Sequence, residues 1–298
     1  MTRDVPMHGL MSSRQSVSYH KMEIDGLEIF YREAGPANAP TVLLLHGFPS
    51  SSRMWEPLLP LLAGKYHLIA PDYPGFGNSS APPPSDFVYT FDNIARVVNE
   101  LTEKLRIREY ILFLQDYGGP VGFRMALGHP GRVRGIIIQN AVVHERGLGP
   151  LWEARRKYWL DPTHELDNLK ANFTSLEATR ARHIGSSPNV ERYDPDVWVD
   201  EYAFLGRPGQ ADIQAQLFLD YRTNVASYLR WQQWLRETRP KLLVLWGKYD
   251  TSFTVAGGTA YAEDVPGAEI HVLEAGHFAL DEATDEIASL VDAFLARL

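Results

Sequence analysis

The chain has 298 residues, of which 45% are hydrophobic and 22% charged, a composition typical of a soluble globular protein with one large or two ordinary domains. A net charge of −8 gives no basis for binding nucleic acid or an anionic membrane, and no apolar run is long enough to span a bilayer. The absence of cysteine excludes disulfides, thiolate metal sites and a cysteine nucleophile, and it favours a cytoplasmic protein.

The N-terminal part of the sequence predicts a tail followed by a β-hairpin. Residues 1–17 mix charged, Ser and Met residues without an apolar core, so we expect a mobile tail and no signal peptide. Two candidate strands, 18–23 and 27–33, flank the pair Asp25 and Gly26, which favours a two-residue turn. The sheet is therefore expected to begin with a hairpin at its edge.

Beyond residue 40, short apolar strands alternate with longer segments. This alternation predicts an α/β fold, in which a mostly parallel sheet carries helices on both faces. We expect helices over residues 91–105 and 282–298. The core of the fold would be formed by residues 18–142 and 240–298. The expected buried strands are residues 41–45, 67–70, 110–114, 135–139, 241–246 and 269–273.

The alternation stops over residues 143–239. This stretch reads as several helices with Pro and Gly breaks and contains no convincing strand, so it predicts an inserted helical cap. Aromatic side chains in a cap over a catalytic edge suit an apolar, water-poor pocket. The same side chains can also serve only to pack the cap onto the sheet. Five of the seven tryptophans lie here: Trp152, Trp159, Trp198, Trp231 and Trp234.

The most informative residue is Asp116, which ends the apolar run 110–114 and precedes two glycines and a helical pattern. An Asp after a buried strand is often only a helix N-cap. A tight strand-to-helix turn, however, lifts one side chain above the sheet edge, beside the free N–H groups of the helix. A carboxylate lifted in this way can attack an electrophilic carbon to form an ester of the enzyme, which water then cleaves. The substrates would then be alkylating electrophiles.

Two further residues supply what such a nucleophile needs. Asp250 follows the strand 241–246, and His277 follows the strand 269–273, so both lie past the carboxyl ends of strands, where parallel sheets gather functional groups. Imidazole is the side chain best matched to take a proton from water near neutral pH. We therefore expect His277 to act as the base and Asp250 to fix its tautomer and stabilise the imidazolium.

A turn after the strand 41–45 completes the predicted site. The backbone N–H of Phe48 can join the N–H of Tyr117 in holding the oxyanion that forms when water attacks the Asp116 ester. His46, just before a glycine in this turn, is expected to bond backbone groups and to play no part as a base.

With these motifs, the sequence resembles the α/β-hydrolase superfamily, and within it the branch with an Asp nucleophile, over nearly the whole chain. The resemblance implies a cofactor-free and metal-free enzyme of the epoxide hydrolase, haloalkane dehalogenase or haloacid dehalogenase type. The matching motifs are His46-Gly47-Phe48-Pro49 with Trp55 following, Pro71-Asp72-Tyr73-Pro74-Gly75-Phe76-Gly77, Gln115-Asp116-Tyr117-Gly118-Gly119, Trp246-Gly247-Lys248-Tyr249-Asp250 and Gly276-His277-Phe278.

Several positions depart from these families. The family pattern has a small residue two positions before the nucleophile, where this chain has Leu114. Haloalkane dehalogenases typically place Trp after the nucleophile, and many use Asn where Phe48 stands, to hold the departing halide. Tyr117 and Phe48 remove both of these halide donors. Fluoroacetate dehalogenases would require Arg directly after the nucleophile, which Tyr117 does not match.

Epoxide hydrolases instead carry acids on the cap, because the ring oxygen becomes an alkoxide when the ring opens. Tyr228 lies about where the resemblance implies the cap tyrosine, and Tyr158 is near the expected second one. An alignment on the following Pro brings Arg155 to that second position, so His183 is a further candidate donor. Either tyrosine could also pack with its hydroxyl in water.

The sequence therefore predicts a hydrolase that opens epoxides to vicinal diols through an ester on Asp116. The alternatives are a haloalkane or haloacid dehalogenase with the same nucleophile, and a non-catalytic ligand-binding protein on the same fold. The expected partner is a small apolar electrophile, with no nucleic acid and no membrane. The oligomeric state is open, and a homodimer is compatible with the sequence.

Overall fold

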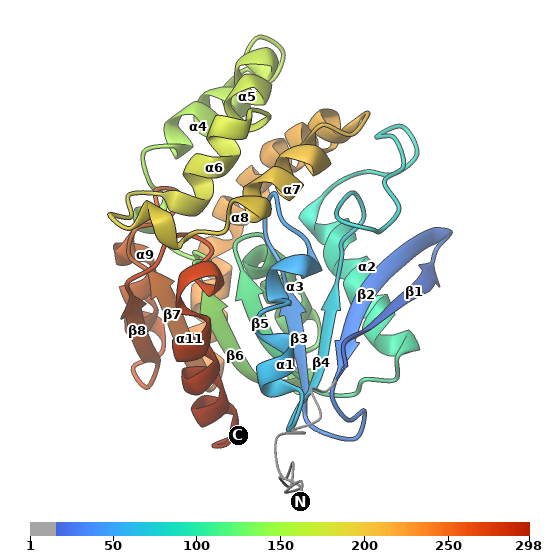
Figure 1. The fold of residues 1–298 in the computed structure, drawn as a ribbon, viewed down its shortest axis with the longest axis vertical. Coiled ribbons are helices and arrows are strands. Elements are labelled where there is room, and N and C mark those ends of the chain that lie inside the picture. The colour runs from blue at the N-terminus through green and yellow to red at the C-terminus, as the bar shows by residue number, and fades with distance from the viewer. Residues whose placement is uncertain (1–15) are drawn as a thin grey trace, which may run out of the picture.

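A sheet of eight strands forms the centre of the structure, a computed structural model that describes residues 16–298 (Figure 1). The tail expected over residues 1–17 lies outside the described residues except for its last two. Every strand expected from the sequence is present, with bounds that differ by at most two residues. The strands are β1 (Ser18–Ile24), β2 (Leu27–Ala34), β3 (Thr41–Leu45), β4 (His67–Pro71), β5 (Tyr110–Gln115), β6 (Val133–Gln139), β7 (Leu242–Gly247) and β8 (Glu269–Leu273).

Helices follow most of the strands. The helix expected over 91–105 is α2, and the one expected over 282–298 is α11, which begins and ends a little earlier. The α-helices are α1 (Leu59–Leu62), α2 (Phe91–Lys104), α3 (Gly118–Gly128), α4 (Trp152–Leu160), α5 (Leu166–Phe173), α6 (Leu176–Ile184), α7 (Pro195–Leu205), α8 (Gln210–Thr238), α9 (Val255–Thr259), α10 (Tyr261–Asp264) and α11 (Leu280–Leu295). Short 3₁₀ helices are η1 (Ser52–Trp55), η2 (Pro130–Arg132), η3 (Glu145–Gly147) and η4 (Val190–Arg192).

The sheet is antiparallel at one edge and parallel elsewhere. Its order is β1-β2-β4-β3-β5-β6-β7-β8, and only the pairs β1 with β2 and β2 with β4 are antiparallel. The hairpin turn is made by Asp25 and Gly26, whose φ angles of 49° and 79° are both positive, as a type I′ turn requires. The expected α/β architecture is confirmed, because all pairs from β4-β3 to β7-β8 in the sheet order are parallel.

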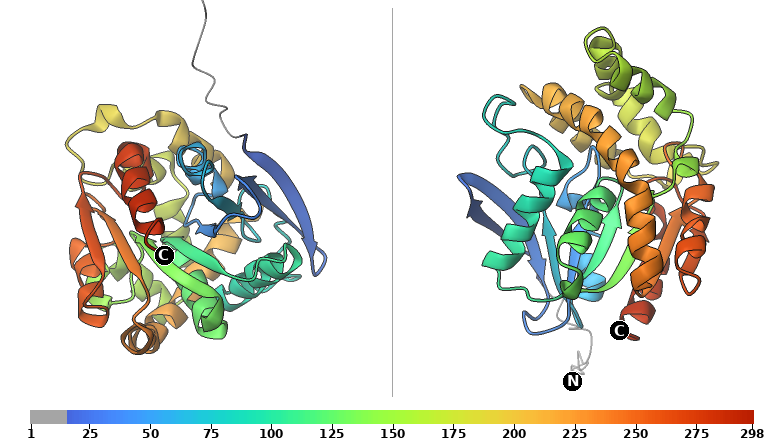
Figure 2. Two further views of the ribbon diagram at one scale, coloured as in Figure 1. Left: turned by 90° about the horizontal axis from the view of Figure 1, so that it is seen from below. Right: turned by 180° about the vertical axis from the view of Figure 1, so that it is seen from behind.

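The parallel strands are apolar throughout because both faces of the sheet are covered. In β3, Leu43 and Leu45 pack into the hydrophobic cluster on one face, while Val42 and Leu44 pack into the cluster on the other. Helices α2 and α3, with part of α8, cover the first face, and α1 and α11 cover the second (Figures 1 and 2). This packing fixes the strand ends, and therefore the loops that follow them, in one plane.

The described residues between β6 and β7 hold helices α4–α8 and no strand. In Figure 1, α4 to α7 lie above the ends of the strands, and Figure 2 shows α8 running from this level down the back of the sheet. Helix α8 is 29 residues long and contacts α2 and α3 as well as α4, α5 and α7. One helix thus joins the stack above the sheet to the packed core.

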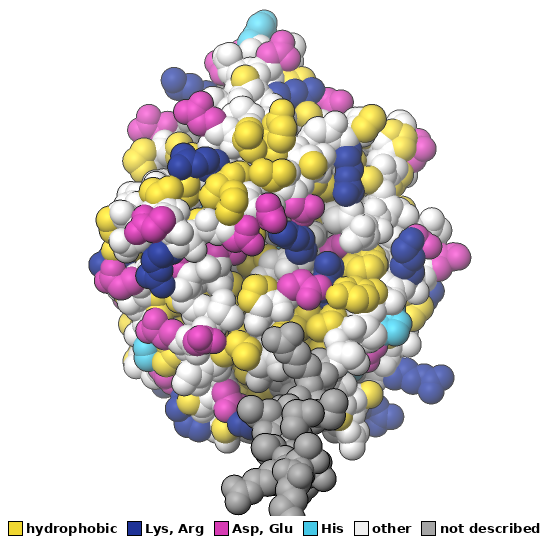
Figure 3. All heavy atoms as spheres, in the orientation of Figure 1, with side chains coloured by type: hydrophobic (Ala, Val, Ile, Leu, Met, Phe, Trp, Pro, Cys, Tyr) yellow, Lys and Arg dark blue, Asp and Glu magenta, His cyan; other side chains and the backbone are white. Residues whose placement is uncertain are grey.

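The surface carries both signs of charge. Over the face shown in Figure 3, acidic and basic side chains are interspersed, and neither sign forms a continuous patch. Several of these charges are paired, as Lys65 is with Asp292 at 2.7 Å. No helix within residues 16–298 combines the length and the apolar character needed to cross a membrane.

Candidate active site

Asp116 occupies a sharp turn between β5 and α3. Its φ of 47° lies in the left-handed region, which a non-glycine residue adopts at an energetic cost and which Asp tolerates better than most. A Cβ added at Gly118 would overlap the carbonyl oxygen of Leu45, so the turn needs glycine there. Leu114 is accommodated in the same way, because a Cβ at Gly122 would overlap its side chain. The missing small residue before the nucleophile is thus compensated in α3.

The two oxygens of the Asp116 carboxylate have different surroundings. Oδ1 accepts a hydrogen bond of 2.8 Å from the N–H of Phe48, and the N–H of Tyr117 also stabilises the charged carboxylate, which lowers its pKa. Oδ2 lies 3.7 Å from Nε2 of His277. Burial raises the pKa of Asp116, and His277 and the two N–H groups oppose this effect. One oxygen is therefore held in place while the other faces the imidazole.

His277 and Asp250 form the second half of the arrangement. Nδ1 of His277 lies 2.7 Å from Oδ2 of Asp250, and both side chains are almost fully buried. The other oxygen of Asp250 accepts the N–H groups of Ser252 and Phe253 at 2.7 and 3.0 Å. Burial alone would lower the pKa of His277, but the carboxylates of Asp250 and Asp116 together raise it. Asp250 thus holds the tautomer in which Nε2, facing Asp116, carries no proton and can act as a base.

Two residues that the sequence analysis did not select support this pair. Asn140, directly after β6, donates to Oδ2 of Asp250 at 2.8 Å and accepts the N–H of Gly247 at 2.9 Å. Gln115 places its amide nitrogen 3.1 Å from Nε2 of His277. Asn140 could have been found from its place at a strand end, where the other site residues lie. Gln115 gave no such signal, because its partner comes from a distant loop.

His46 is held by the backbone. Its Nδ1 lies 3.1 Å from the carbonyl oxygen of Gly47, and its Nε2 accepts the N–H of Tyr73 at 3.4 Å. The imidazole also stacks on the Tyr73 ring, with the ring centroids 4.0 Å apart. Burial lowers the pKa of His46 to about 4, so the ring stays neutral. This environment is consistent with the structural role expected for His46.

Three tyrosines extend from the nucleophile into α8. The hydroxyl of Tyr117 is buried without a hydrogen-bond partner among the described residues. The ring of Tyr221 lies 5.9 Å from that of Tyr117, and the Tyr221 hydroxyl lies 3.4 Å from the hydroxyl of Tyr228. Burial raises the pKa of all three phenols, so each keeps its proton at neutral pH. Tyr228 is therefore linked to Tyr117 through Tyr221, which the sequence analysis did not select.

The structure places Tyr158 differently from what was expected. Its hydroxyl donates to the carbonyl oxygen of Ala215 in α8 at 3.3 Å, and the side chain is buried among the helices above the sheet. A phenol has one proton to donate, and this one is engaged with the backbone. The expectation that Tyr158 assists the leaving group is therefore not supported by its geometry, which is that of a packing residue.

His183 also differs from the expectation of a substrate donor. Its Nδ1 lies 2.7 Å from Asp281 and its Nε2 lies 2.8 Å from Glu201, so both ring nitrogens are occupied. Burial would lower the pKa of His183, but these two carboxylates raise it to about 9. The ring stacks on Phe278, beside the predicted base, with centroids 4.3 Å apart. His183 thus ties α6 to the loop that carries His277 and has no proton free for a substrate.

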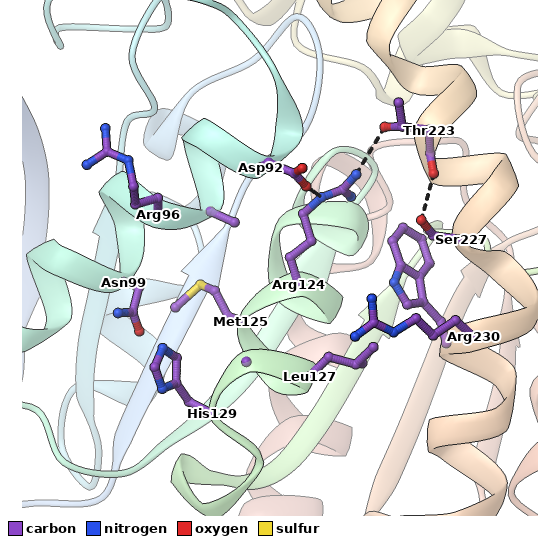
Figure 4. A pocket seen from close by; sticks show the side chains of 13 residues that line it. Asp92, Arg96, Asn99, Arg124, Met125, Leu127, His129, Thr223, Ser227 and Arg230 are labelled. Atoms are coloured by element: carbon purple, nitrogen blue, oxygen red, sulfur yellow. Dashed lines mark hydrogen bonds and ion pairs between the residues drawn. The ribbon is translucent and has the colours of Figure 1, made fainter.

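A cavity of about 560 Å³ lies away from these residues (Figure 4). It is bordered by α2, α3 and α8, and none of the predicted site residues lines it. Arg124 in its wall is already bonded, to Asp92 and at 2.7 Å to Asn224. Its size alone does not make it the reaction site, because the paired acid and base lie elsewhere.

Comparisons with known proteins agree with this fold. Residues 40–284 match the model of the family described as having the alpha/beta hydrolase fold. An uncharacterized hydrolase of Saccharomyces cerevisiae is 40% identical, over 93% of this chain and 97% of that protein. Haloalkane dehalogenase 2 of Mycobacterium tuberculosis is 30% identical, over 88% of this chain and 90% of that protein. Among solved structures, the ligand-free epoxide hydrolase CorEH superposes with a TM-score of 0.77 at 19% identity, over 95% and 99% of the two chains.

Proposed function

The chain belongs to the α/β-hydrolase fold family, and on that basis we propose that it opens epoxides to vicinal diols through a covalent ester on Asp116. One observation carries the proposal: Oδ1 of Asp116 is held by the N–H of Phe48 while Oδ2 faces His277 at 3.7 Å. A carboxylate fixed in this way is oriented to attack carbon with its second oxygen. In this proposal residues 143–239 act as the cap that encloses the substrate.

In the first step, Oδ2 of Asp116 attacks one ring carbon of the epoxide. The bond between this carbon and the ring oxygen breaks, and its electron pair stays on the oxygen. A tyrosine phenol gives its proton to that oxygen, so the step yields an ester of Asp116, a free hydroxyl and a phenolate. Tyr221 and Tyr228 are the proposed donors, because their hydroxyls lie 3.4 Å apart next to Tyr117.

In the second step, His277 takes a proton from water through Nε2, and the resulting hydroxide adds to the carboxyl carbon of the ester. The negative charge that develops on Oδ1 is held by the two N–H groups that already bond the carboxylate. Collapse of this intermediate releases the diol and regenerates the Asp116 carboxylate. The proton on the imidazolium returns to the phenolate, so the net reaction is the addition of one water molecule.

A dehalogenase is the second candidate, favoured by the likeness to a haloalkane dehalogenase of 30% identity. The same ester would form, but the leaving halide needs hydrogen bonds and no proton. The buried and unpartnered hydroxyl of Tyr117 is the group best suited to this task. A purely ligand-binding protein is disfavoured, because such a protein has no chemical need for a nucleophile, a base, an acid and two oxyanion donors together.

A single turnover in heavy-oxygen water tests the ester mechanism with an epoxide and with a chloroalkane. Because water attacks the carboxyl carbon, we expect the new hydroxyl of the product to be mostly unlabelled and the label to appear in Asp116. A labelled product with an unlabelled Asp116 would contradict the ester. Turnover of the chloroalkane but not of the epoxide would assign the chain to the dehalogenases.

A further inference from the structure

A cavity of about 400 Å³ lies among α4, α5, α6 and α8. Phe173 and Phe218 are part of its wall. Both rings pack against the ring of Phe48, with centroid distances of 5.7 and 4.9 Å. Phe48 therefore borders both the cavity wall and the nucleophile, because its N–H holds the Asp116 carboxylate.

Two arginines stand in the same wall, Arg155 from α4 and Arg182 from α6. The guanidinium carbon of Arg182 lies 4.6 Å from the centre of the Phe48 ring. That of Arg155 lies 5.0 Å from the centre of the Phe218 ring and 4.2 Å from that of Trp152. Both cations thus lie over aromatic rings near the nucleophile, and the charge of Asp116 acts on each of them.

Neither guanidinium has an ion pair or a hydrogen bond with any residue in the described part of the chain, and Nη1 of Arg182 is buried without a partner. The contrast with other sheltered arginines is clear: Arg32 pairs with Glu56 at 2.7 Å, and Arg124 pairs with Asp92. Two carboxylates act on the charge of Arg182 without pairing with it: Glu201, which is bonded to His183, and Asp116.

Two neighbouring cations that form no ion pair with any described residue are unfavourable in a sheltered site. Burial, and next the charge of Arg155, lower the pKa of Arg182 to about 10. The other charged groups at the cavity are Glu153 and Lys157, which lie on the exposed side of α4 and leave the cavity with an excess of positive charge. An anion that entered would relieve this repulsion and satisfy the free N–H groups.

We infer that the substrate is an electrophile that carries a carboxylate, which Arg155 and Arg182 bind while the adjacent carbon meets Asp116. This rests on the proposed function, and it narrows the substrate class to 2,3-epoxy acids or 2-halo acids. The two cations also offset the repulsion between the substrate carboxylate and the anionic nucleophile. The expected apolar pocket is thereby revised to an aromatic pocket with an anion site.

Glycidate and glycidamide, which differ only in a carboxylate and a neutral amide, test the inference directly. We expect the wild type to favour glycidate in kcat/KM by about 10- to 100-fold. Arg182→Met and Arg155→Met should each remove most of this preference through KM, because they delete binding that is equal in the ground and transition states. Arg180→Met is the matched control, since Arg180 is an exposed residue of the same helix, and it should keep the preference.

Equal use of the two substrates by the wild type, or equal losses with both in the arginine variants, would overturn the inference. Equal losses would mean that the arginines act on the leaving group.

Binding to the Asp116→Asn variant separates this inference from the proposed reaction. Calorimetry with isobutyrate and isobutyramide needs no turnover, and we expect only the carboxylate to bind, with the heat lost on Arg182→Met in the same background. If no epoxide or halide is hydrolysed but isobutyrate binds, the proposed reaction is wrong and the anion site stands. If epoxides are hydrolysed but isobutyrate binds no better than its amide, the reaction stands and the anion site is wrong.

Discussion

Asp250 at the edge of the sheet and Arg182 in the helices above it differ in how their polar atoms are satisfied. At the sheet edge, Asp250 accepts hydrogen bonds from Ser252, Phe253 and Asn140 and also holds His277. Next to the helices, the hydroxyl of Tyr117 and Nη1 of Arg182 are buried without partners among residues 16–298. Buried polar groups normally find partners within the protein, so those that do not are candidates for binding a ligand. Asp250 and His277 are thus held by their hydrogen bonds, while Tyr117 and Arg182 keep donors that a ligand could satisfy.

The largest effect on activity is expected from a variant that removes the nucleophile but preserves the backbone turn at residue 116. Asn tolerates the positive φ of residue 116, and an amide oxygen can still accept the N–H of Phe48, so Asp116→Asn should fold normally. An amide is a poor nucleophile, and we expect kcat to fall by about 10⁴-fold or more. Steady-state kinetics measures kcat of the variant and of the wild type, and thermal unfolding checks that the variant is folded. A variant within tenfold of the wild type would show that Asp116 does not attack.

Substitutions of the tyrosines in α8 test whether this helix supplies the proton donor for the leaving oxygen. Tyr221→Phe should lower kcat for epoxides by an amount equivalent to roughly 2–4 kcal/mol, the range for a lost oxyanion donor. Tyr228→Phe should have a smaller effect if Tyr228 acts through the Tyr221 hydroxyl, which lies 3.4 Å away. Tyr158→Phe is the control, because its hydroxyl is bonded to a backbone carbonyl. Equal kcat values for all three variants would exclude a tyrosine donor from this helix.

His183 connects α6 to the loop that carries His277. Its protonation should therefore make the free energy of unfolding depend on pH. Burial opposes its charge, but Glu201 and Asp281 raise its pKa in the folded state to about 9, above the ordinary value of 6.5. The stabilisation is therefore complete below about pH 6.5 and is lost as the pH rises through about 9, by roughly 3 kcal/mol for a shift of this size. Urea unfolding of the wild type and of His183→Gln at pH 6 and pH 10 measures the difference. Equal losses in both proteins would exclude this role.

Arg155 and Arg182, which form no ion pair within residues 16–298, predict a smaller change in stability. Here the substitution should stabilise the protein, whereas loss of the His183 charge destabilises it. If Arg182 is retained for binding at the expense of stability, Arg182→Met should stabilise the ligand-free protein by about 1 kcal/mol. Arg180→Met, on the exposed side of the same helix, should change stability by less than about 0.5 kcal/mol. Thermal unfolding of the three proteins without ligand provides the comparison. A clear destabilisation by Arg182→Met would mean that the side chain contributes mainly to packing.

The sequence predicted the sheet and its edge far better than the helical layer. Asp116, Asp250 and His277 each follow a buried strand, and parallel strands bring their carboxyl ends together, so their proximity follows from chain order. The partners of residues in the helical layer depend on how helices rotate and cross, which local patterns do not encode. For that reason Tyr158 and His183 were expected near the substrate but bond other parts of the protein.

The most direct test of the central claim uses His277→Gln. This change removes the base that the second step needs but leaves the attack by Asp116 intact, so an ester should accumulate on the protein during incubation with an epoxide. Peptide mass spectrometry should then find the mass of the added substrate on Asp116, and the wild type should carry it only transiently. An unmodified Asp116 peptide from a variant that is saturated with a substrate of the wild type, or a label on any other residue, would contradict the covalent mechanism.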